Sequence, residues 1–178
     1  SANGLYGKVN PPLRPREDVE ALWDAVLEGY VDWVVSDHAC CKPETKLGAD
    51  PDDVWQAKSG FGGTEYLLAG VFSEGTRRGL TPNRVAELTS WNPSRRFGLY
   101  SKGDIDIGFD ADIALVDPTA TWVVHAKESE SAQGYSPMEG VELTGRVTHS
   151  FLRGNQILDS GEVVGDAHGR YLSRPYSS

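Results

Sequence analysis

A carboxylate, an imidazole and two thiols stand close together in the stretch SDHACC, residues 36–41, directly after an apolar, β-branched stretch. In parallel α/β folds the carboxyl ends of strands carry the reactive side chains, because the loops there converge on one mouth. A carboxylate such as Asp37 at that place can bind a divalent metal, which lowers the pKa of its bound water from 15.7 towards about 7. The same carboxylate can take the water's proton and pass it to a leaving nitrogen. One interpretation of the stretch is therefore a hydrolytic site.

Simpler interpretations of the same stretch remain open. An Asp after a strand is often a loop or helix cap, and Asp37 and His38 could form a local hydrogen-bonded pair. Cys40 or Cys41 could act as a nucleophile, but no partner histidine is identifiable by spacing, so burial or pocket lining is favoured. Adjacent cysteines rarely satisfy disulfide geometry. The chain has only these two cysteines, which favours a reducing, cytoplasmic compartment.

The elements that would position Asp37 form a strand–helix–strand pattern. Residues 7–10 are β-like, residues 15–30 place apolar side chains at spacings of three and four, and residues 31–37 form a short apolar, β-branched stretch. The middle spacing is typical of one face of a helix. About 30 residues is the size of a βαβ unit with parallel strands. The sequence thus predicts an α/β arrangement with Asp37 at a strand end.

Further along the chain the pattern changes from helical to β-rich. Residues 42–63 form a long polar segment of the kind that is often functional. Pro82 after Thr81 and Pro93 after Asn92 are typical helix starts. They predict helices at 81–91 and 92–98. A further helix is expected before them, at 64–78. After residue 102, short alternating stretches predict strands and hairpins. We therefore expect one domain at 1–102 and a β-rich domain at 103–178.

The composition excludes some classes of function. The net charge is −9, with no basic patch that could neutralise phosphates, so nucleic acid is not an expected partner. No run of about 18 apolar residues occurs, so no membrane span is expected. The first residues have no apolar signal core, and the chain enters almost directly into a β-like stretch. These features favour the cytoplasm and a piece of a longer protein.

Several motifs together resemble one family. They are KVNPPLR, SDHACCKPETK, GFGGTE, NPSRRFGL and KGDIDIGFDADIALVDP. Their order is similar to that in the cyclic amidohydrolases, which include dihydroorotase, allantoinase and the hydantoinase/dihydropyrimidinase enzymes. The resemblance implies an α/β fold, the C-terminal portion of a metal-dependent (β/α)8 TIM barrel. The last two β/α units would be followed by the C-terminal part of a small β-sandwich.

The resemblance also implies a set of site residues. Asp37 would end the last barrel strand, ligate a divalent metal, most simply zinc, and shuttle the proton. Asn10 and Arg14 would lie near the substrate, and Cys41 and Gly62 would line its pocket. The substrate would be a small cyclic amide whose C–N bond is hydrolysed. Members of the family commonly form homo-oligomers, so we expect one here.

One departure from the family pattern bears on the substrate. Dihydroorotases typically place a histidine that contacts the substrate carboxylate where this chain has Cys41. The stretch SDHACCKPE instead resembles allantoinases, whereas KVNPPLR leans toward dihydroorotases and GFGGTE toward dihydroorotases and hydantoinases. Loss of the carboxylate-binding histidine suits a neutral cyclic ureide. We therefore favour an allantoinase- or hydantoinase-like substrate, with dihydroorotate as the next candidate.

A second departure concerns the metal. The family's His-x-His pair, its carboxylated lysine and its two other metal-binding histidines belong to earlier strands, and none occurs in this sequence. Catalytic zinc normally has about three protein ligands. We therefore expect the chain alone to be inactive, to bind metal weakly or not at all, and to need the N-terminal part of the barrel as its partner. The alternative functions are a non-catalytic amidohydrolase-like scaffold subunit, against which Asp37 argues, and a binding module in the β-rich part.

Overall fold

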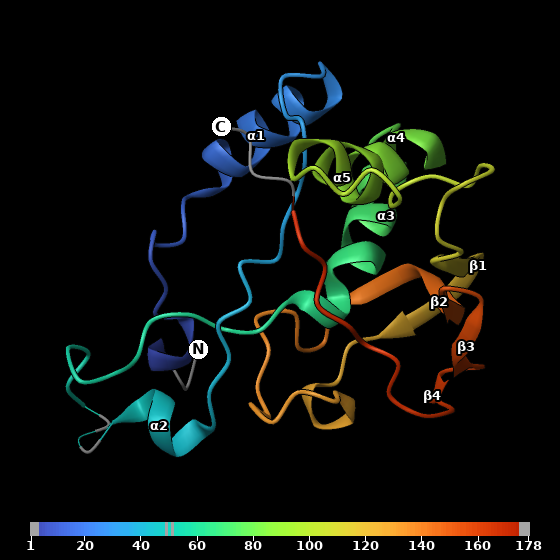
Figure 1. The fold of residues 1–178 in the computed structure, drawn as a ribbon. Coiled ribbons are helices and arrows are strands. Elements are labelled where there is room, and N and C mark those ends of the chain that lie inside the picture. The colour runs from blue at the N-terminus through green and yellow to red at the C-terminus, as the bar shows by residue number, and fades with distance from the viewer. Residues whose placement is uncertain (1–3, 49, 51, 175–178) are drawn as a thin grey trace.

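A computed structural model describes residues 4–48, 50 and 52–174 (Figure 1). Its α-helices are α1 (Arg16–Leu27), α2 (Pro43–Leu47), α3 (Leu67–Arg77), α4 (Pro82–Ala86) and α5 (Asn92–Arg96). Single turns of helix are η1 (Gly4–Gly7), η2 (Thr64–Tyr66), η3 (Glu87–Trp91) and η4 (Ala126–Glu128). The strands are β1 (Ile113–Val123), β2 (Glu142–Leu152), β3 (Asn155–Asp159) and β4 (Glu162–Val163). They form one antiparallel sheet in the order β1-β2-β3-β4.

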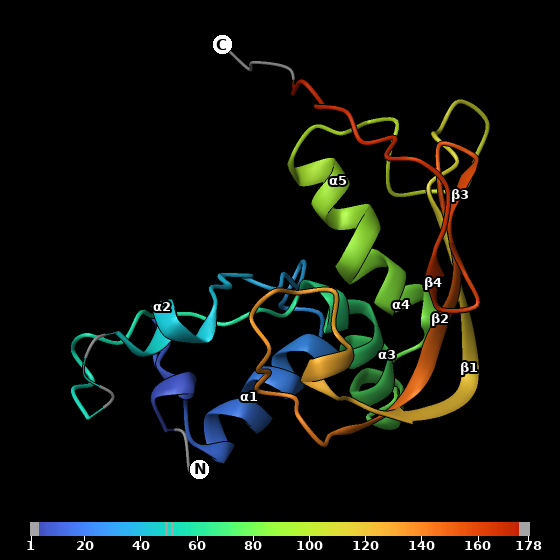
Figure 2. The same cartoon turned by 90° about the horizontal axis from the view of Figure 1, so that it is seen from below.

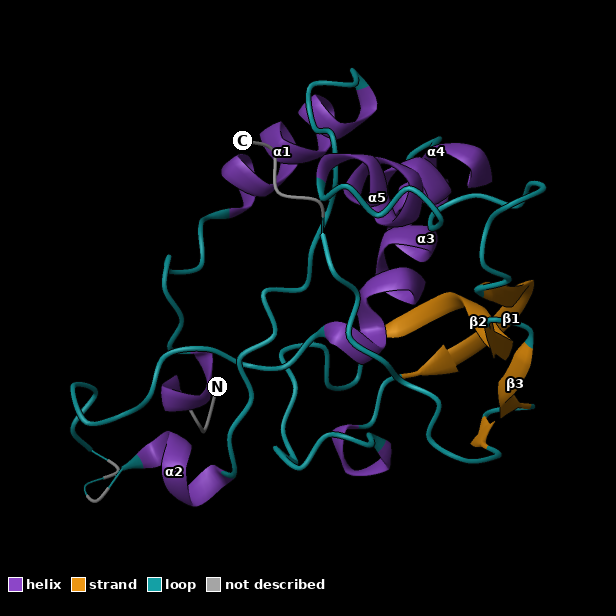
Figure 3. Cartoon of the chain, in the orientation of Figure 1, coloured by secondary structure: helices purple, strands orange, loops and turns teal. Residues whose placement is uncertain are grey.

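The helices α3, α4 and α5 lie on one side of the sheet (Figure 2). Helix α1 lies beyond α3, on the side away from the sheet. The remaining part, which contains α2, is mostly loop (Figure 3). The chain is therefore a helical layer against a sheet, with a loop-rich extension that carries Asp37 and its neighbours.

The local signals in the sequence place the helices correctly. Pro15 precedes α1, whose first turn carries Glu17 and Asp18, and acidic residues suit the positive end of a helix. At the start of α4 the hydroxyl of Thr81 accepts from the backbone N–H of Arg84 at 3.2 Å. This contact satisfies one of the donors that every helix start leaves free. The predicted helices at 15–30, 64–78 and 81–91 are confirmed, with shorter bounds.

The predicted break before residue 92 is wrong, because α4, η3 and α5 follow one another without a gap. Pro93 has no N–H and cannot donate to the carbonyl four residues earlier. The preceding turn, η3, is π-helical, and Asn92 donates its N–H to Glu87, five residues back. Such a wider turn inserts one residue into the helix. The chain thus passes Pro93 without ending the helix.

The two stretches expected as barrel strands are not strands here. Residues 8–10 and 31–37 make no ladder hydrogen bonds. The N–H of Val34 donates instead to the carbonyl of Leu88 in η3 at 3.0 Å. A strand exists only through hydrogen bonds to a neighbouring strand, and the described part of the chain supplies no such neighbour to either stretch. Val31 and Val34 are partly buried and pack against the core around α3, α4 and η3, whereas Val35 is exposed.

The β-rich region begins later than expected. Residues 103–112 were predicted to start the strands, but they form turns, and β1 begins at Ile113. The carboxylate of Asp104 accepts from the N–H of Ile105 at 2.8 Å, and that of Asp106 from Ile107 at 2.7 Å. Such local bonds compete with strand pairing. The domain boundary near residue 102 stays a prediction.

Two apolar cores hold these layers. The first lies among α1, α3, α4 and η3, with Val26, Val71, Leu80, Val85 and Leu88 at its centre. The second joins α3 to the sheet through Tyr66, Ala69, Val124 and Leu143. At this junction Gly145 is required by space, because a Cβ there would lie 2.4 Å from the ring of Phe72. The sheet therefore packs closely on α3.

Candidate functional site

The sequence KSGFGGT, residues 58–64, is the centre of the candidate site, and we call it the glycine-rich segment. The end of the first predicted strand, at residues 7–10, contacts this segment. The N–H of Gly60 donates to the carbonyl of Lys8 at 2.9 Å. The amide of Asn10 donates to the hydroxyl of Ser59 at 3.2 Å. Asn10 therefore lies against the segment.

The second predicted strand end docks further along the same segment. The N–H of Ala39 donates to the carbonyl of Phe61 at 3.1 Å. His38 accepts at Nδ1 from the N–H groups of Gly63 and Thr64, at 3.2 and 3.3 Å. Because Nδ1 accepts, the proton of a neutral His38 ring sits on Nε2. His38 thus fixes backbone and does not pair with the carboxylate beside it.

Asp37 lies between residues that are tied down on both sides. Its backbone has φ of 44°, in the left-handed region that non-glycine residues seldom adopt. Its side chain is exposed, and no hydrogen bond or ion pair to it occurs within the described residues. Helix α2 begins after Lys42, so Asp37 is not its cap. Within the described structure Asp37 is therefore a loop residue that neither caps a helix nor bonds to His38, and its carboxylate is exposed.

A loop from the β-rich part reaches the same segment. The side chain of Gln133 accepts at Oε1 from the N–H of Gly62 at 2.7 Å, and its amide donates to the carbonyl of Tyr135. The hydroxyl of Tyr135 lies 4.0 Å from the thiol of Cys41. Its ring stacks on Tyr6, with centroids 4.4 Å apart. Gly62 and Cys41, both predicted to line the pocket, are thus joined through one loop.

Burial and two neighbouring thiols shape the electrostatics here. Burial is the largest cause that raises the pKa of the Tyr135 hydroxyl, and its neighbours Cys41 and Cys40 raise it further. Tyr135 is therefore a neutral hydroxyl group throughout the neutral range, able to donate a hydrogen bond.

Two lysines hold the loops around the segment. Lys46 of α2 is completely buried, and its ammonium group donates to the carbonyls of Lys8 and Gly60, both at 2.7 Å. Burial lowers the pKa of this group. Lys8 in turn donates to the carbonyls of Val54 and Ala57, at 2.8 and 2.6 Å. The long polar loop after Asp37 is thus anchored by cations bonded to backbone oxygens.

The structure gathers most, but not all, of the expected residues. Asn10, Cys41 and Gly62 lie on the glycine-rich segment or contact its partners, and Asp37 is flanked by residues bonded to it. Arg14 is exposed, and no described contact brings it to the segment. Sequence reasoning missed Gln133, Tyr135 and Lys46. A buried glutamine in a polar loop and a lysine in a five-residue helix leave no local pattern that would have indicated them.

The residues present do not form a metal centre by themselves. Within the described ranges no group of three or more His, Cys, Asp or Glu side chains is placed to hold an ion. Asp37 supplies one carboxylate, and a catalytic zinc needs about three protein ligands. The chain alone therefore does not fit the metal that the resemblance implies.

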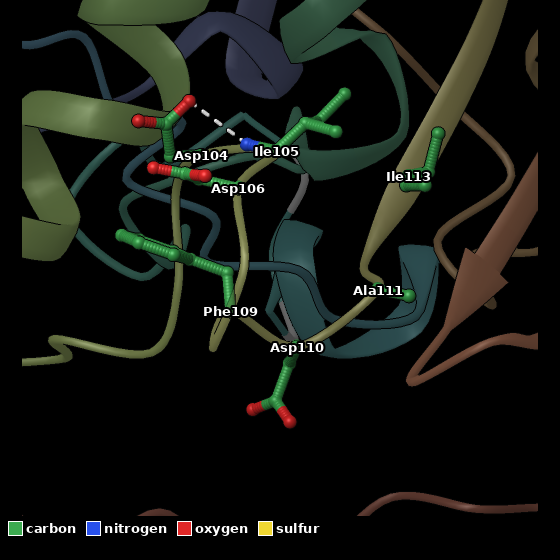
Figure 4. A pocket seen from close by; sticks show the side chains of 7 residues that line it. All are labelled: Asp104, Ile105, Asp106, Phe109, Asp110, Ala111 and Ile113. Atoms are coloured by element: carbon green, nitrogen blue, oxygen red, sulfur yellow. Dashed lines mark hydrogen bonds between the residues drawn. The ribbon is translucent and has the colours of Figure 1, made fainter.

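Two surface hollows involve none of these residues. One, of about 90 Å³, is lined by the turn at 104–111 and by Ile113 (Figure 4). The other, of about 450 Å³, lies on the sheet beside Arg146 and His149.

The turn at 104–111 is closed by Lys102, which forms ion pairs with Asp110 at 3.0 Å and with Asp112. The motif KGDIDIGFDAD is thus a structural clamp between α5 and β1.

The fold and this arrangement of loops belong to a class of hydrolases built on α/β barrels. A model of the Amidohydrolase family matches residues 6–157. The chain is 44% identical to an allantoinase of Rubrobacter xylanophilus over 170 residues, which cover 95% of this chain and 37% of the relative. It is 36% identical to an allantoinase of Solibacter usitatus, with coverage of 95% and 36%.

Solved structures give the same result. A D-hydantoinase superposes with a TM-score of 0.91 and 32% identity, over 96% of this chain and 38% of the hydantoinase. An L-hydantoinase (dihydropyrimidinase) from Arthrobacter aurescens gives a TM-score of 0.84 at 32% identity, over 93% and 37%. The chain belongs to the amidohydrolase family, and the predicted fold class, a portion of the barrel with part of the small β domain, is confirmed. It spans just over a third of the length of these relatives.

The stretches at 8–10 and 31–37 are unpaired in the described structure. The superposition shows that the backbone keeps the path of the hydantoinases, although the described residues offer no strand to pair with these stretches.

No helix in the described ranges is long and apolar enough to cross a bilayer.

Proposed function

We propose that the protein to which these residues belong hydrolyses a C–N bond of a small cyclic ureide, in the manner of an allantoinase or hydantoinase. The observation that carries this proposal is Asp37, an exposed carboxylate without a hydrogen-bond partner in the described structure, held between residues bonded to the glycine-rich segment. The relatives named allantoinase and hydantoinase support the reaction class.

In this proposal Asp37 is the general base and acid. Its carboxylate accepts a proton from the attacking water and later delivers it to the ring nitrogen that leaves. Asn10 and Arg14 bind the substrate, and Cys41 and Gly62 line its pocket. Asp37 is also one ligand of a divalent metal, zinc in the simplest case, whose other ligands lie outside this chain. The chain alone is therefore inactive.

The neutral ring is favoured over dihydroorotate because of what surrounds Cys41. Its thiol faces the hydroxyl of Tyr135, and neither group offers a positive charge to a substrate carboxylate. Lys46 points away, to the carbonyls of Lys8 and Gly60. We further propose that the protein is cytoplasmic and forms a homo-oligomer. Size-exclusion chromatography with light scattering measures the oligomeric state directly.

The test is an assay of the complete gene product with allantoin, hydantoin, dihydrouracil and dihydroorotate. Asp37→Asn keeps the shape of the side chain but removes its capacity to take a proton, so kcat should fall by about a thousandfold or more. Asp24→Asn, on the exposed face of α1, is the matched control and should keep the wild-type rate. Wild-type turnover in Asp37→Asn would exclude the proposed mechanism.

The alternative is a non-catalytic scaffold subunit, which is consistent with the described residues placing no group of three or more His, Cys, Asp or Glu side chains to hold an ion. The residues encoded upstream discriminate between the two. A His-x-His pair and a later lysine would support the enzyme, and their absence from the complete gene would support the scaffold.

A further inference from the structure

We infer that Gln133 is a positioning residue: through it, the loop at 129–135, which we call the latch loop, holds the glycine-rich segment in the conformation that binds substrate. The inference rests on the proposed function. It extends the site from the barrel part of the chain into the β-rich part.

The contact between Gln133 and Gly62 is buried, and both polar atoms of the Gln133 amide have a hydrogen-bond partner. Gln133 is 3% exposed, although it stands in a polar loop. Its Oε1 accepts from the N–H of Gly62 at 2.7 Å, and its amide N–H donates to the carbonyl of Tyr135. A buried N–H without an acceptor is strongly unfavourable. The segment therefore has a strong preference for the conformation that reaches Gln133.

Space at Gly62 shows that the fit is close. A Cβ on Gly62 would lie 2.8 Å from both the Oε1 and Nε2 atoms of Gln133. A side chain at residue 62 would therefore displace the glutamine. Glycine is present there because the amide of Gln133 lies directly against the backbone, and the two residues form one unit.

The latch loop has three further contacts around the segment. Ser129 donates its hydroxyl to Glu65, just after the segment, at 2.5 Å. Tyr135 stacks on Tyr6 and lies beside the thiol of Cys41. The loop thus contacts the segment at Gly62, the residue that follows the segment, and Cys41, so we expect displacement of Gln133 to affect both residues that we propose to line the pocket.

The step from Gln133 to substrate follows from these positions. The N–H groups of Gly63 and Thr64, next to Gly62, bind Nδ1 of His38, the neighbour of Asp37. A shift at Gly62 would displace the pocket wall, while the bonds from Gly63 and Thr64 keep His38, and with it the backbone beside Asp37, in place. The expected consequence is weaker binding of substrate, because the pocket wall is displaced while Asp37 itself is unchanged.

The test uses Gln133→Leu in the complete gene product. Leucine has about the same size but no acceptor for the N–H of Gly62. We expect KM for the ureide that the enzyme accepts to rise about tenfold or more, with kcat within about threefold of wild type. The exchange of the Gly62 amide hydrogen should accelerate by at least about tenfold. The matched control is Gln156→Leu, a partly buried glutamine of β3 whose amide donates to a backbone carbonyl; it should change neither quantity.

The split between KM and kcat separates positioning from stability. A purely structural role would lower the active fraction, so that kcat falls while KM stays constant, and this result would overturn the inference. If Gln133→Leu does not fold, Gln133→Asn replaces it, because a side chain shorter by about 1.5 Å cannot reach Gly62. A wild-type KM in Gln133→Asn would then contradict it.

Failure of the proposed function can be told apart from failure of this inference. If the wild-type gene product hydrolyses no ureide, the proposed function fails, and the exchange rate at Gly62 still reports on the contact. A Gly62 amide that exchanges at the wild-type rate in the Gln133 variant overturns the inference, whatever the activity.

Discussion

The ammonium group of Lys46 donates to the carbonyl oxygen of Gly60 at 2.7 Å, in a site from which solvent is completely excluded. A second bond at the same length goes to the carbonyl of Lys8. One buried cation therefore joins the first predicted strand end, α2 and the glycine-rich segment. No carboxylate pairs with this ammonium within the described residues, and its hydrogen-bond partners are the two backbone carbonyls.

Removal of this cation should destabilise the loops around the segment. Lys46→Met keeps the aliphatic length but leaves two carbonyls without a donor, which costs about 1–3 kcal/mol of unfolding free energy. Chemical denaturation of the chain measures the loss. Lys127→Met, at an exposed position, is the control and should change stability by less than about 0.5 kcal/mol. An equal effect of both substitutions would show that the bonds of Lys46 contribute little.

Acid should weaken the ion pairs at the C-terminal end of α3. Arg77 and then Arg78 hydrogen-bond to Glu74 and hold the pKa of its carboxyl at about 2, below the usual 4.5. A lowered pKa means that the stabilisation is complete above pH 4.5 and is lost as the pH falls towards 2. With allowance for solvent screening, the loss is on the order of 1–2 kcal/mol.

Unfolding measured between pH 5 and pH 2.5 tests this prediction in a pair of variants. Glu74→Gln should be less stable at pH 5 and should show a flatter pH dependence than wild type. Glu130→Gln, at an exposed position without a described ion pair, should keep the wild-type slope. A wild-type slope in Glu74→Gln would contradict the assignment of the acid sensitivity to this carboxyl.

The clamp at Lys102 should matter for folding and not for substrate choice. Burial disfavours its charge, but hydrogen bonds to Asp112 and Asp110 outweigh burial, so the pKa of Lys102 is raised above 10.5. The stabilisation is therefore complete below pH 10.5 and is lost as the pH rises through the folded-state value. Lys102→Met leaves the two partly exposed carboxylates without their cation and should cost about 1–2 kcal/mol, measured by urea unfolding at pH 7. A loss below about 0.5 kcal/mol would show that the motif is not a clamp.

Substitution at Cys41 should change substrate preference if the proposed function holds. In the complete gene product, Cys41→His introduces a donor that can bind a substrate carboxylate. The ratio of kcat/KM for dihydroorotate to that for allantoin should rise by about tenfold or more. Cys40→His, at the exposed neighbouring position, is the control. An unchanged ratio in Cys41→His would remove the argument for a neutral ring.

The chain alone should hold little metal. Asp37 gives one ligand where about three are needed, so plasma mass spectrometry after dialysis should find less than about 0.1 equivalents of zinc. The complete gene product is the positive control. One tightly held equivalent in the chain alone would show that ligands have been overlooked.

The sequence by itself determined the family and the helices within 15–30, 64–78 and 81–91, but not α2 or the continuity of α4, η3 and α5. Helical periodicity and the starts at Thr81 and Pro82 are local signals, and a helix satisfies its hydrogen bonds within the same segment. The motif around Asp37 is likewise a local pattern, and it was sufficient to indicate a candidate catalytic residue. A strand cannot be determined in this way, because residues 31–37 become a strand only when another strand pairs with them.

Only the tertiary structure decided what surrounds Asp37. Gln133 meets Gly62 across 71 positions of sequence, and nothing in the residues next to either one encodes that contact. The same holds for Lys46, whose partners are backbone oxygens that any residue could provide. Burial and hydrogen bonding between distant segments are properties of the folded chain, and for this reason the latch loop and the lysine anchors emerged only from the structure.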